Sequence, residues 1–263
     1  MKVMRAGKQH SIKELEVAVA LKGNFDASYT KADNRLVVAT DSMKNTVNVL
    51  AKQKLGAENE DFGLILGTHF LKKYRQVKQV AITLSERSWD RLSVNGKPHA
   101  HSFVLGSSAR TISKIICTSK ENRVESGIEG LTILKTTASG FENFVRDEFT
   151  TLPEVGDRIL ATELKAVWTY TKTPKSYLTA NKKILDAVLK VFASNYSVSA
   201  QATLYEMGEA ALKAVPEISK ITIAMPNKHC LLINLTPFGL ENKNELFVPA
   251  DEPHGQIEGT IGR

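Results

Sequence analysis

The loop between two strand-like runs, residues 131–135 and 159–170, carries the residues best suited to chemistry: Phe141 and Arg158. A phenylalanine ring offers a flat face for stacking, and a guanidinium offers a planar fork that can bond two acceptors at once. Together they suit a flat, anionic, hydrogen-bonding ligand. A long surface loop laced with ion pairs is the alternative, because Arg146, Asp147 and Asp157 lie on the same loop.

Two other polar positions lie where helices are expected to begin. Thr40 and Asp41 follow a β-branched run and precede a helical pattern. The N–H groups of a helix start can hold a small anion, although a plain helix cap explains the same residues. Gln201 lies in the first turn of a later helix, where its amide could bond the edge of a heterocycle or simply cap the helix.

The segment Met225-Pro-Asn-Lys-His229 supplies a candidate for proton transfer. Pro226 indicates a break between two strands, and Asn227 and His229 alternate onto the same side. A histidine close to an amide at a strand end can move protons near neutral pH, whereas a lone histidine more often has a structural role.

The elements that must position these residues follow the same order twice. Each half of the chain reads as strand, strand, helix, helix, strand, strand. In the first half we expect strands at 11–21, 34–39, 79–86 and 101–105 and helices at 42–54 and 59–74, and a further strand-like run at 112–118 closes this half. In the second half we expect strands at 131–135, 159–170, 218–225 and 230–235, and helices at 180–194 and 200–215. This order predicts an α+β fold made of two modules, 1–125 and 126–263, each an antiparallel sheet with helices on one face.

Composition excludes several classes of protein. With 42% hydrophobic and 24% charged residues, the 263-residue chain is typical of soluble globular proteins, and no apolar run is long enough to span a membrane. The net charge of +7 is dispersed, which disfavours nucleic acid as a partner. Cys117 and Cys230 read as buried thiols, and no CxxC or HExxH spacing predicts a metal site.

Taken together, these segments resemble the urate oxidase (uricase) family. The matching motifs, in order and spacing, are ATDSMKNT, LTILKTTASGFENFVRDEFTTLPEVGDRILAT, SAQATLYEMG, MPNKH and FVPADEPHGQIEGTI. The resemblance covers nearly the whole chain. It implies two tunnelling-fold modules per chain, assembled as an oligomeric barrel, a homotetramer with active sites at the subunit interfaces.

The resemblance also implies an enzyme of purine metabolism. Family members degrade urate by oxidising it with O2 and water to 5-hydroxyisourate and hydrogen peroxide, with no metal and no organic cofactor. An enzyme of the same fold class acting on a pterin or another purine is a distant alternative, since such enzymes typically anchor the ligand through a glutamate.

Substrate-binding roles follow from the resemblance for seven residues. Phe141 is expected to stack on the purine, while Arg158 and Gln201 clamp opposite polar edges. The other expected contacts are a pocket wall at Leu152, backbone contacts at Ser199 and Ala200, and Asp41 from a neighbouring subunit.

The resemblance assigns catalysis to three polar residues and a lysine. Asn227 is expected to hold O2 or water above the ring, and His229 to form a proton relay with Thr40 and the lysine. In the family that lysine lies in a Tyr-Gly-Lys motif, which aligns ahead of Met1; Lys8 superficially resembles it, but using Lys8 deletes the first strand. The sequence therefore also allows a urate-binding homologue with impaired catalysis.

The compartment is expected to be peroxisomal or cytoplasmic. Many eukaryotic members of the family finish with a Ser-Lys-Leu-like peroxisomal signal, whereas this sequence finishes with Ile261-Gly-Arg263.

Overall fold

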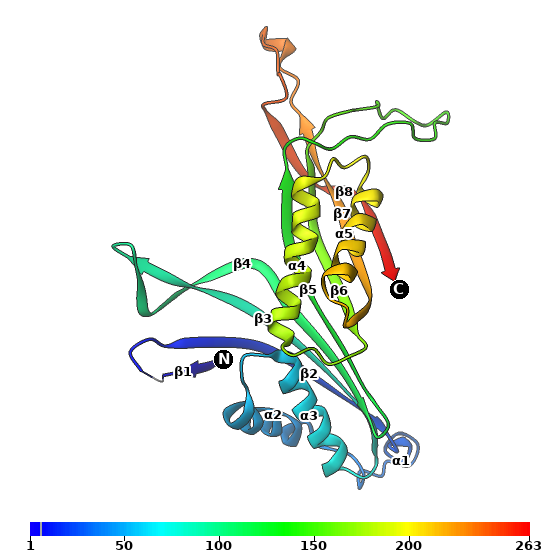
Figure 1. Cartoon of the computed structure of the whole chain (residues 1–263). Helices are drawn as coiled ribbons and strands as arrows, with labels where there is room; N and C mark the ends of the chain where they lie inside the picture. The colour runs from blue at the N-terminus through cyan, green and yellow to red at the C-terminus, as the bar shows by residue number, and fades with distance from the viewer. Residues whose placement is uncertain (6) are drawn as a thin grey trace. The chain divides into compact units, whose positions relative to one another are not determined.

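The computed structural model describes residues 1–5 and 7–263, which form one antiparallel sheet and its covering helices (Figure 1). The strands are β1 Lys2–Met4, β2 Ser11–Gly23, β3 Val77–Val94, β4 Lys97–Thr118, β5 Asn122–Lys135, β6 Leu160–Tyr170, β7 Ile218–Leu232 and β8 Phe247–Gly262. The helices are α1 Asp26–Thr30, α2 Thr40–Lys54, α3 Asn59–Lys73, α4 Tyr177–Ser194 and α5 Ala200–Ala214, with a short 3-10 turn, η1, at Thr236–Phe238. Neighbouring strands are hydrogen-bonded in sequence order from β1 to β8. The predicted α+β class with an antiparallel sheet is confirmed.

The chain divides into two compact units. The first comprises Met1–Glu129, Val167–Asn181 and Glu217–Ser219. The second comprises Gly130–Ala166, Lys182–Pro216 and Lys220–Arg263. Each unit is described separately below, and the predicted module boundary between residues 125 and 126 stays a prediction.

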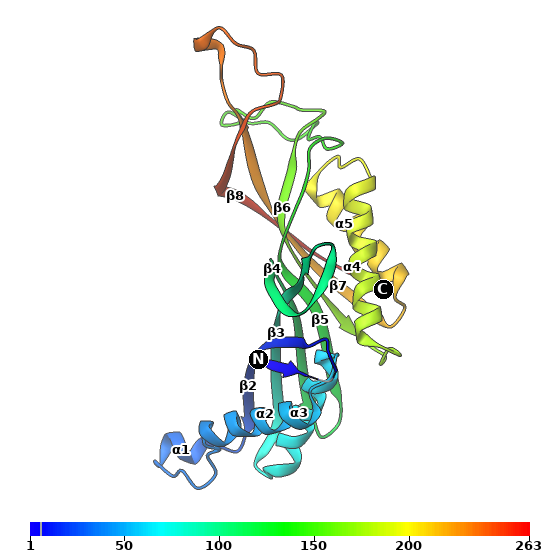
Figure 2. The same ribbon diagram turned by 90° about the vertical axis from the view of Figure 1, so that its left-hand side faces the viewer.

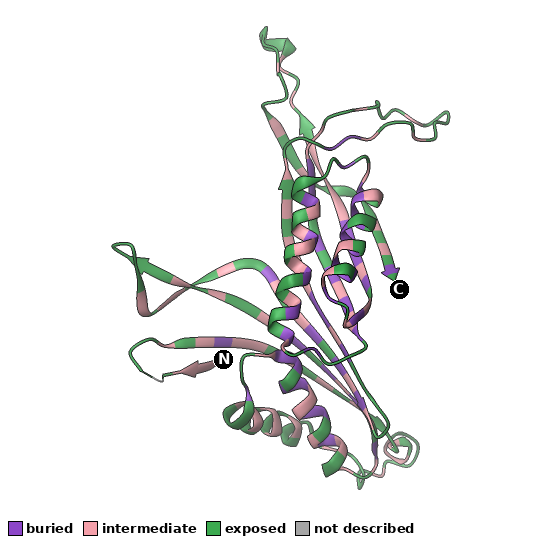
Figure 3. Cartoon of the chain, in the orientation of Figure 1, coloured by how far each residue is buried: buried purple, intermediate pink, exposed green. Residues whose placement is uncertain are grey.

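In the first unit, α3 packs closely on β3 and β4. Its apolar residues Phe62, Leu66 and Phe70 are fully buried, as the helical spacing predicts. Figure 3 shows buried stretches on α3, whereas α2 has none. Glycine permits the close approach, because a Cβ on Gly67 would lie 2.4 Å from the sulfur of Cys117 on β4. The hairpin between β3 and β4 turns at Asn95-Gly96, where φ is 52° and 74°, the left-handed backbone that favours these residues.

In the second unit, α4 and α5 lie side by side against the sheet (Figure 1, Figure 2). α4 buries Ile184, Val188 and Phe192 along one stripe. α5 packs against β8, and Gly208 lets the two elements meet, since a Cβ there would lie 2.6 Å from Cδ1 of Ile261.

Two expected strand assignments are wrong. Residues 34–39 form no strand; the segment is a turn closed by the N–H of Val37 donating to the carbonyl of Asn34. The two strands that precede α2 are instead β1 and β2. The two separate strands expected at 218–225 and 230–235 join as β7. β7 continues through Pro226, which lies opposite Gln256 of β8. The strand accommodates the proline because its pairing with β8 shifts register just after it, between Asn227 and His229.

Two further expectations need adjustment. Residues 101–105 and 112–118 belong to one long strand, β4, rather than two. Cys117 is buried as expected, whereas Cys230 is half-buried, and both thiols are free.

Candidate active site

The loop 136–159, which joins β5 to β6, is closed at its base by backbone pairing within the second unit (Figure 1). Phe141 and Val155 exchange two backbone hydrogen bonds of 2.7 and 3.1 Å. The N–H of Arg158 donates to the carbonyl of Ser139 at 2.7 Å. The two ends of the loop, residues 137–141 and 155–158, are therefore held together, and they are called the neck below. The neck brings Phe141 and Arg158 close to each other.

Asp157 fixes the other side of this neck. Its carboxylate accepts from the Thr137 hydroxyl at 2.9 Å and from the Ala138 N–H at 3.0 Å. Asp157 therefore has a structural role, because its carboxylate orders the backbone immediately before Phe141.

The neck is also tied to the segment that precedes α5. The N–H of Gly140 donates to the carbonyl of Ser197 at 2.8 Å, and the N–H of Ser197 donates to the carbonyl of Ala138 at 2.9 Å. The hydroxyl of Tyr196 donates to the carbonyl of Gly156 at 2.6 Å. These bonds place the start of α5 beside the neck.

The side chains of Phe141 and Arg158 meet above the neck. Cζ of Arg158 lies 5.4 Å from the centroid of the Phe141 ring. Nε of Arg158 is buried, and no group in the described part of the chain bonds it. Burial lowers the pKa of the Arg158 guanidinium, so the cation is incompletely solvated and gains energy from an anionic acceptor.

Phe144 is a residue of this site that the sequence analysis missed. Its ring stacks on Phe141 at 4.8 Å between centroids and 8° between planes. Arg146 lies over the ring of Phe144 at 5.4 Å and donates to the carbonyl of Leu152 at 3.1 Å. The Phe-x-x-Phe spacing in FENF was the available signal. Leu152 itself is 50% exposed.

At the start of α5, Ser199 is the N-cap, and its Oγ accepts from the N–H of Ala202 at 3.1 Å. Ala200 is buried and Gln201 is exposed. Since Ser199 supplies the cap, the expectation that Gln201 caps the helix is wrong, and its expected contact with a ligand stays a prediction.

Asn227 and His229 lie half-buried on β7, opposite Gly255 and Ala250 of β8. Lys228 between them forms ion pairs with Asp251 at 2.7 Å and with Glu163 at 3.7 Å. Lys228 is therefore held by two carboxylates, and Asn227 and His229 flank it in the strand.

Thr40 and Asp41 belong to the first unit, whereas the residues described above belong to the second. The expectation that one of them caps α2 is wrong: the cap position is Ala39, with no side-chain bond. Asp41 instead accepts from Nδ2 of Asn45 at 3.0 Å, one helical turn later. Lys8 is exposed in the connection between β1 and β2.

Neither a metal cluster nor a membrane helix is found in the described residues. No group of three or more histidine, cysteine, aspartate or glutamate side chains there could hold a metal ion. No helix there is long and apolar enough to cross a membrane.

Comparison with known proteins gives consistent matches. The family model described as Uricase matches residues 1–115 and 124–258. A uricase of Emericella nidulans is 42% identical over 268 residues, spanning 96% of this chain and 89% of that protein. A uricase of Arthrobacter globiformis is 40% identical over 263 residues, spanning 100% of this chain and 85% of that protein.

Solved structures agree with the sequence matches. The crystal structure of uricase from Arthrobacter globiformis superposes with a TM-score of 0.94 at 41% identity, covering 100% of this chain and 90% of that one. A urate oxidase from Bacillus sp. TB-90 superposes with a TM-score of 0.84 at 27% identity, covering 95% of this chain and 87% of that one.

Proposed function

Because this chain belongs to the uricase family, we propose that it is a urate oxidase, which converts urate, O2 and water to 5-hydroxyisourate and hydrogen peroxide. The reaction inserts one hydroxyl oxygen into the purine, and O2 accepts two electrons and two protons to become the peroxide. Family membership favours this active enzyme over a homologue that only binds urate.

The observation that carries the proposal is the pairing of Arg158 with Phe141. A flat anion stacked on the Phe141 ring brings acceptors on its edge within reach of the guanidinium, whose buried Nε has no other described partner. Urate is flat and carries carbonyl oxygens and ring nitrogens around its edge. The bidentate fork of arginine matches two such acceptors.

The remaining substrate contacts come from the start of α5 and from the loop. Gln201 bonds the edge of urate opposite Arg158, while Ser199 and Ala200 contribute backbone contacts. Leu152 forms one wall of the pocket. The exposure of Gln201 and Leu152 in the single chain supports roles in contact with a ligand.

Proton transfer is assigned to Asn227, His229 and Thr40. Asn227 holds O2 or water above the ring, and His229 and Thr40 relay protons. In this proposal Thr40 and Asp41 contribute from a neighbouring subunit of a homotetramer, as the resemblance to the family implies. In this proposal the two tunnelling-fold modules are residues 1–125 and 126–263.

No metal or organic cofactor is required by the proposed chemistry. Urate is electron-rich, and the loss of a second proton makes it more so, which allows it to donate an electron to O2 directly. The protein then supplies positioning, a base and a place for peroxide.

The test is ultraviolet absorbance of urate with the purified chain in aerated buffer, together with peroxide detection. We expect urate loss with an equal amount of peroxide, no loss without O2, and no change after treatment with a metal chelator. Absence of urate loss contradicts the proposed activity, and loss that a chelator abolishes contradicts cofactor independence.

A further inference from the structure

The pairing of β7 with β8 is interrupted at one point, between Asn227 and His229, and this interruption is called the β7–β8 bulge below. Asn227 lies opposite Gly255, and His229 lies opposite Ala250. Lys228 therefore stands against all the β8 residues between Ala250 and Gly255 and has no register partner among them. An interruption of this kind bends a strand and re-aims the side chains beside it. The side chains beside it here are the two that the proposed reaction uses.

Polar contacts close the β7–β8 bulge. Nζ of Lys228 donates to Oδ1 of Asp251 on β8 at 2.7 Å and lies 3.7 Å from Oε2 of Glu163 on β6. Within the β8 side of the bulge, Nδ1 of His254 lies 2.9 Å from the carbonyl oxygen of Asp251 and 3.2 Å from Oε1 of Glu252. Because β7 lies between β6 and β8 in the sheet, Lys228 ties three neighbouring strands together at this point.

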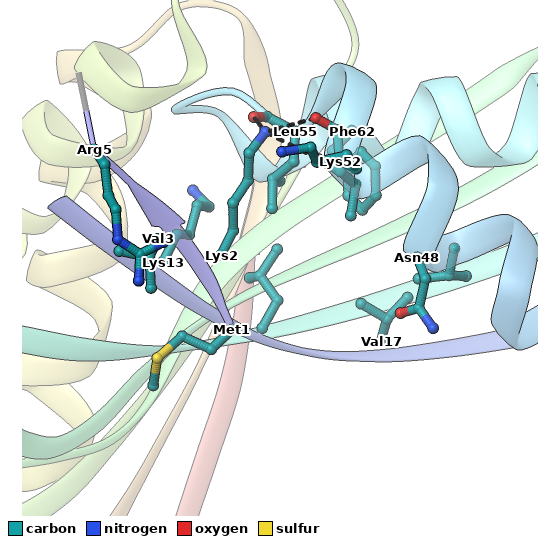
Figure 4. Close-up of a pocket in the computed structure, with 13 residues that line it drawn as sticks. Met1, Lys2, Val3, Arg5, Lys13, Val17, Asn48, Lys52, Leu55 and Phe62 are labelled. Carbon is teal, nitrogen blue, oxygen red and sulfur yellow. Dashed lines mark hydrogen bonds between the residues drawn. The ribbon is translucent and has the colours of Figure 1, made fainter. Parts of the chain in front are cut away.

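Lys228 is used differently from a lysine that only caps a helix. Lys2 is an example of that ordinary use, since its Nζ donates to two backbone carbonyls at the end of α2, as Figure 4 shows. Lys228 instead contacts carboxylates on two different strands, and its side chain is 26% exposed. Its contacts therefore hold β7 to β8 at the position where backbone pairing is absent.

The Lys228 contact persists across the neutral pH range. The hydrogen bond from Lys228 lowers the pKa of Asp251, and the same bond raises the pKa of Lys228. The contact is therefore lost only as pH falls through the lowered pKa of Asp251, or as pH rises through the raised pKa of Lys228. Glu163, Glu252 and His254 are the other titratable groups that face the bulge in the items of contact above. Between those limits Lys228 stays a cation, which suits a fixed anchor and not a proton carrier.

We propose that Lys228 is a positioning residue, which holds the β7–β8 bulge so that Asn227 and His229 keep their places at the reacting groups. This role rests on the urate oxidation proposed above. Consecutive Cα atoms are about 3.8 Å apart, so a backbone shift at Lys228 moves both neighbours. A misplacement of about 1 Å can lower a rate on the order of 100-fold, whereas a partly exposed ion pair adds little to folding stability. Loss of the contact should therefore lower the rate far more than the stability.

Lys228→Met tests this role, because it keeps the apolar stem and removes the charge. The matched control is Lys243→Met, which removes a lysine of the same unit that lies 3.7 Å from Glu241. For Lys228→Met we expect kcat to fall roughly 10- to 100-fold, with KM for urate within about twofold and Tm lowered by less than about 4 °C. KM is retained because Phe141 and Arg158 are untouched. The control should change none of these.

A conservative variant and a pH profile separate positioning from proton transfer. Lys228→Arg should recover most of kcat, because a guanidinium can bond the same carboxylate. In Lys228→Met, the profile of kcat/KM between about pH 6 and 9 should keep its shape, because Lys228 does not titrate there. A lost or shifted limb shows that Lys228 itself exchanges a proton, and this overturns the proposal.

Hydrogen exchange gives a readout that does not depend on catalysis. In Lys228→Met, amide exchange across residues 225–231 should be about tenfold faster than in the unmodified chain or in Lys243→Met. Unchanged exchange, unchanged kcat, or an equal loss of kcat in Lys243→Met overturns the proposal. A rise in KM that accounts for the whole loss also overturns it, because it assigns Lys228 to binding. If the unmodified chain oxidises no urate, the proposed function fails, and the exchange comparison still decides whether Lys228 holds the bulge.

Discussion

Arg158 and Phe141 face each other across the neck of one loop, with 5.4 Å between the guanidinium carbon and the ring centroid. Backbone bonds from Arg158 to Ser139 and between Phe141 and Val155 fix both residues before any ligand arrives. Preorganisation of this kind lowers the cost of ordering the site on binding.

Replacing Arg158 tests the guanidinium fork. Arg158→Lys keeps the charge and loses the planar pair of donors. Since hydrogen bonds to charged groups contribute about 1.5–3 kcal/mol, we expect kcat/KM for urate to fall roughly 10- to 150-fold, mainly through KM. Steady-state kinetics, followed by urate absorbance, measure kcat/KM and KM of the variant. Arg146→Lys is the matched control, because Arg146 lies over Phe144 on the exposed side of the loop. Similar losses in both variants contradict the assignment.

Replacing the two stacked rings separates their roles. Phe141→Leu removes the face that we propose contacts the purine, worth about 0.5–1.5 kcal/mol, so KM should rise roughly two- to tenfold. Phe144→Leu should have a smaller effect, because Phe144 touches Phe141 and sets the plane of its ring. A larger rise in KM for Phe144→Leu than for Phe141→Leu reverses the two roles.

Asp157 is expected to matter for order in the loop. Asp157→Ala removes the acceptor of the Thr137 hydroxyl and the Ala138 N–H. We expect the free energy of unfolding to fall by about 1–2 kcal/mol and KM to rise, measured by urea denaturation and by kinetics. Thr137→Val removes only one of these bonds and should cost less. An unchanged urea midpoint for Asp157→Ala shows that the neck does not depend on the carboxylate.

Close packing of α3 on β4 gives a stability prediction. A Cβ at Gly67 meets the sulfur of Cys117 at 2.4 Å and its Cβ at 3.0 Å, so Gly67→Ala should destabilise the chain by about 1–3 kcal/mol. Gly56→Ala is the control, because a Cβ added at Gly56 would meet nothing within 4 Å. Thermal unfolding should show a Tm lowered by about 2–4 °C per kcal/mol for the first variant and little change for the second.

Burial raises the pKa of the Cys117 thiol. The folded state then holds this proton more tightly than the unfolded state. The resulting stabilisation is fully present below the unfolded thiol pKa, about 8.5, and is lost as pH rises from there through the folded pKa. Urea titrations between pH 7 and 10 should show the decline, and Cys117→Ala should make it shallower. Iodoacetamide at pH 8 should modify Cys230 before Cys117; equal rates contradict the buried thiol.

The sequence predicted the four longer helices, α2 to α5, because their signals are local. The spacing of Phe62, Leu66 and Phe70 is sufficient for α3, and Asn95-Gly96 is sufficient for the turn. Residues 34–39 were wrongly predicted as a strand. A β-branched run forms a strand only when it pairs with another strand, and this run forms a turn. Pro226 wrongly predicted a break between two strands, because a register shift in the pairing with β8 lets the proline remain within β7.

The candidate site was predictable in its residue types and not in its geometry. Phe141 and Arg158 could be chosen from their chemistry. Their contact depends on the bridge between Phe141 and Val155, which no periodicity encodes. Phe144 went unnoticed because a second aromatic in a loop has no meaning until its ring is seen parallel to the first.

The order of the sheet bears on how the chain emerges from the ribosome. Every strand from β1 to β8 lies next to its predecessor in sequence. Each newly made strand therefore meets a partner that is already present, and none must wait for a later segment to be inserted between existing neighbours. As the chain is synthesised from its N-terminus, the sheet can grow by one strand at a time. This shortens the interval in which any strand edge is exposed to other nascent chains.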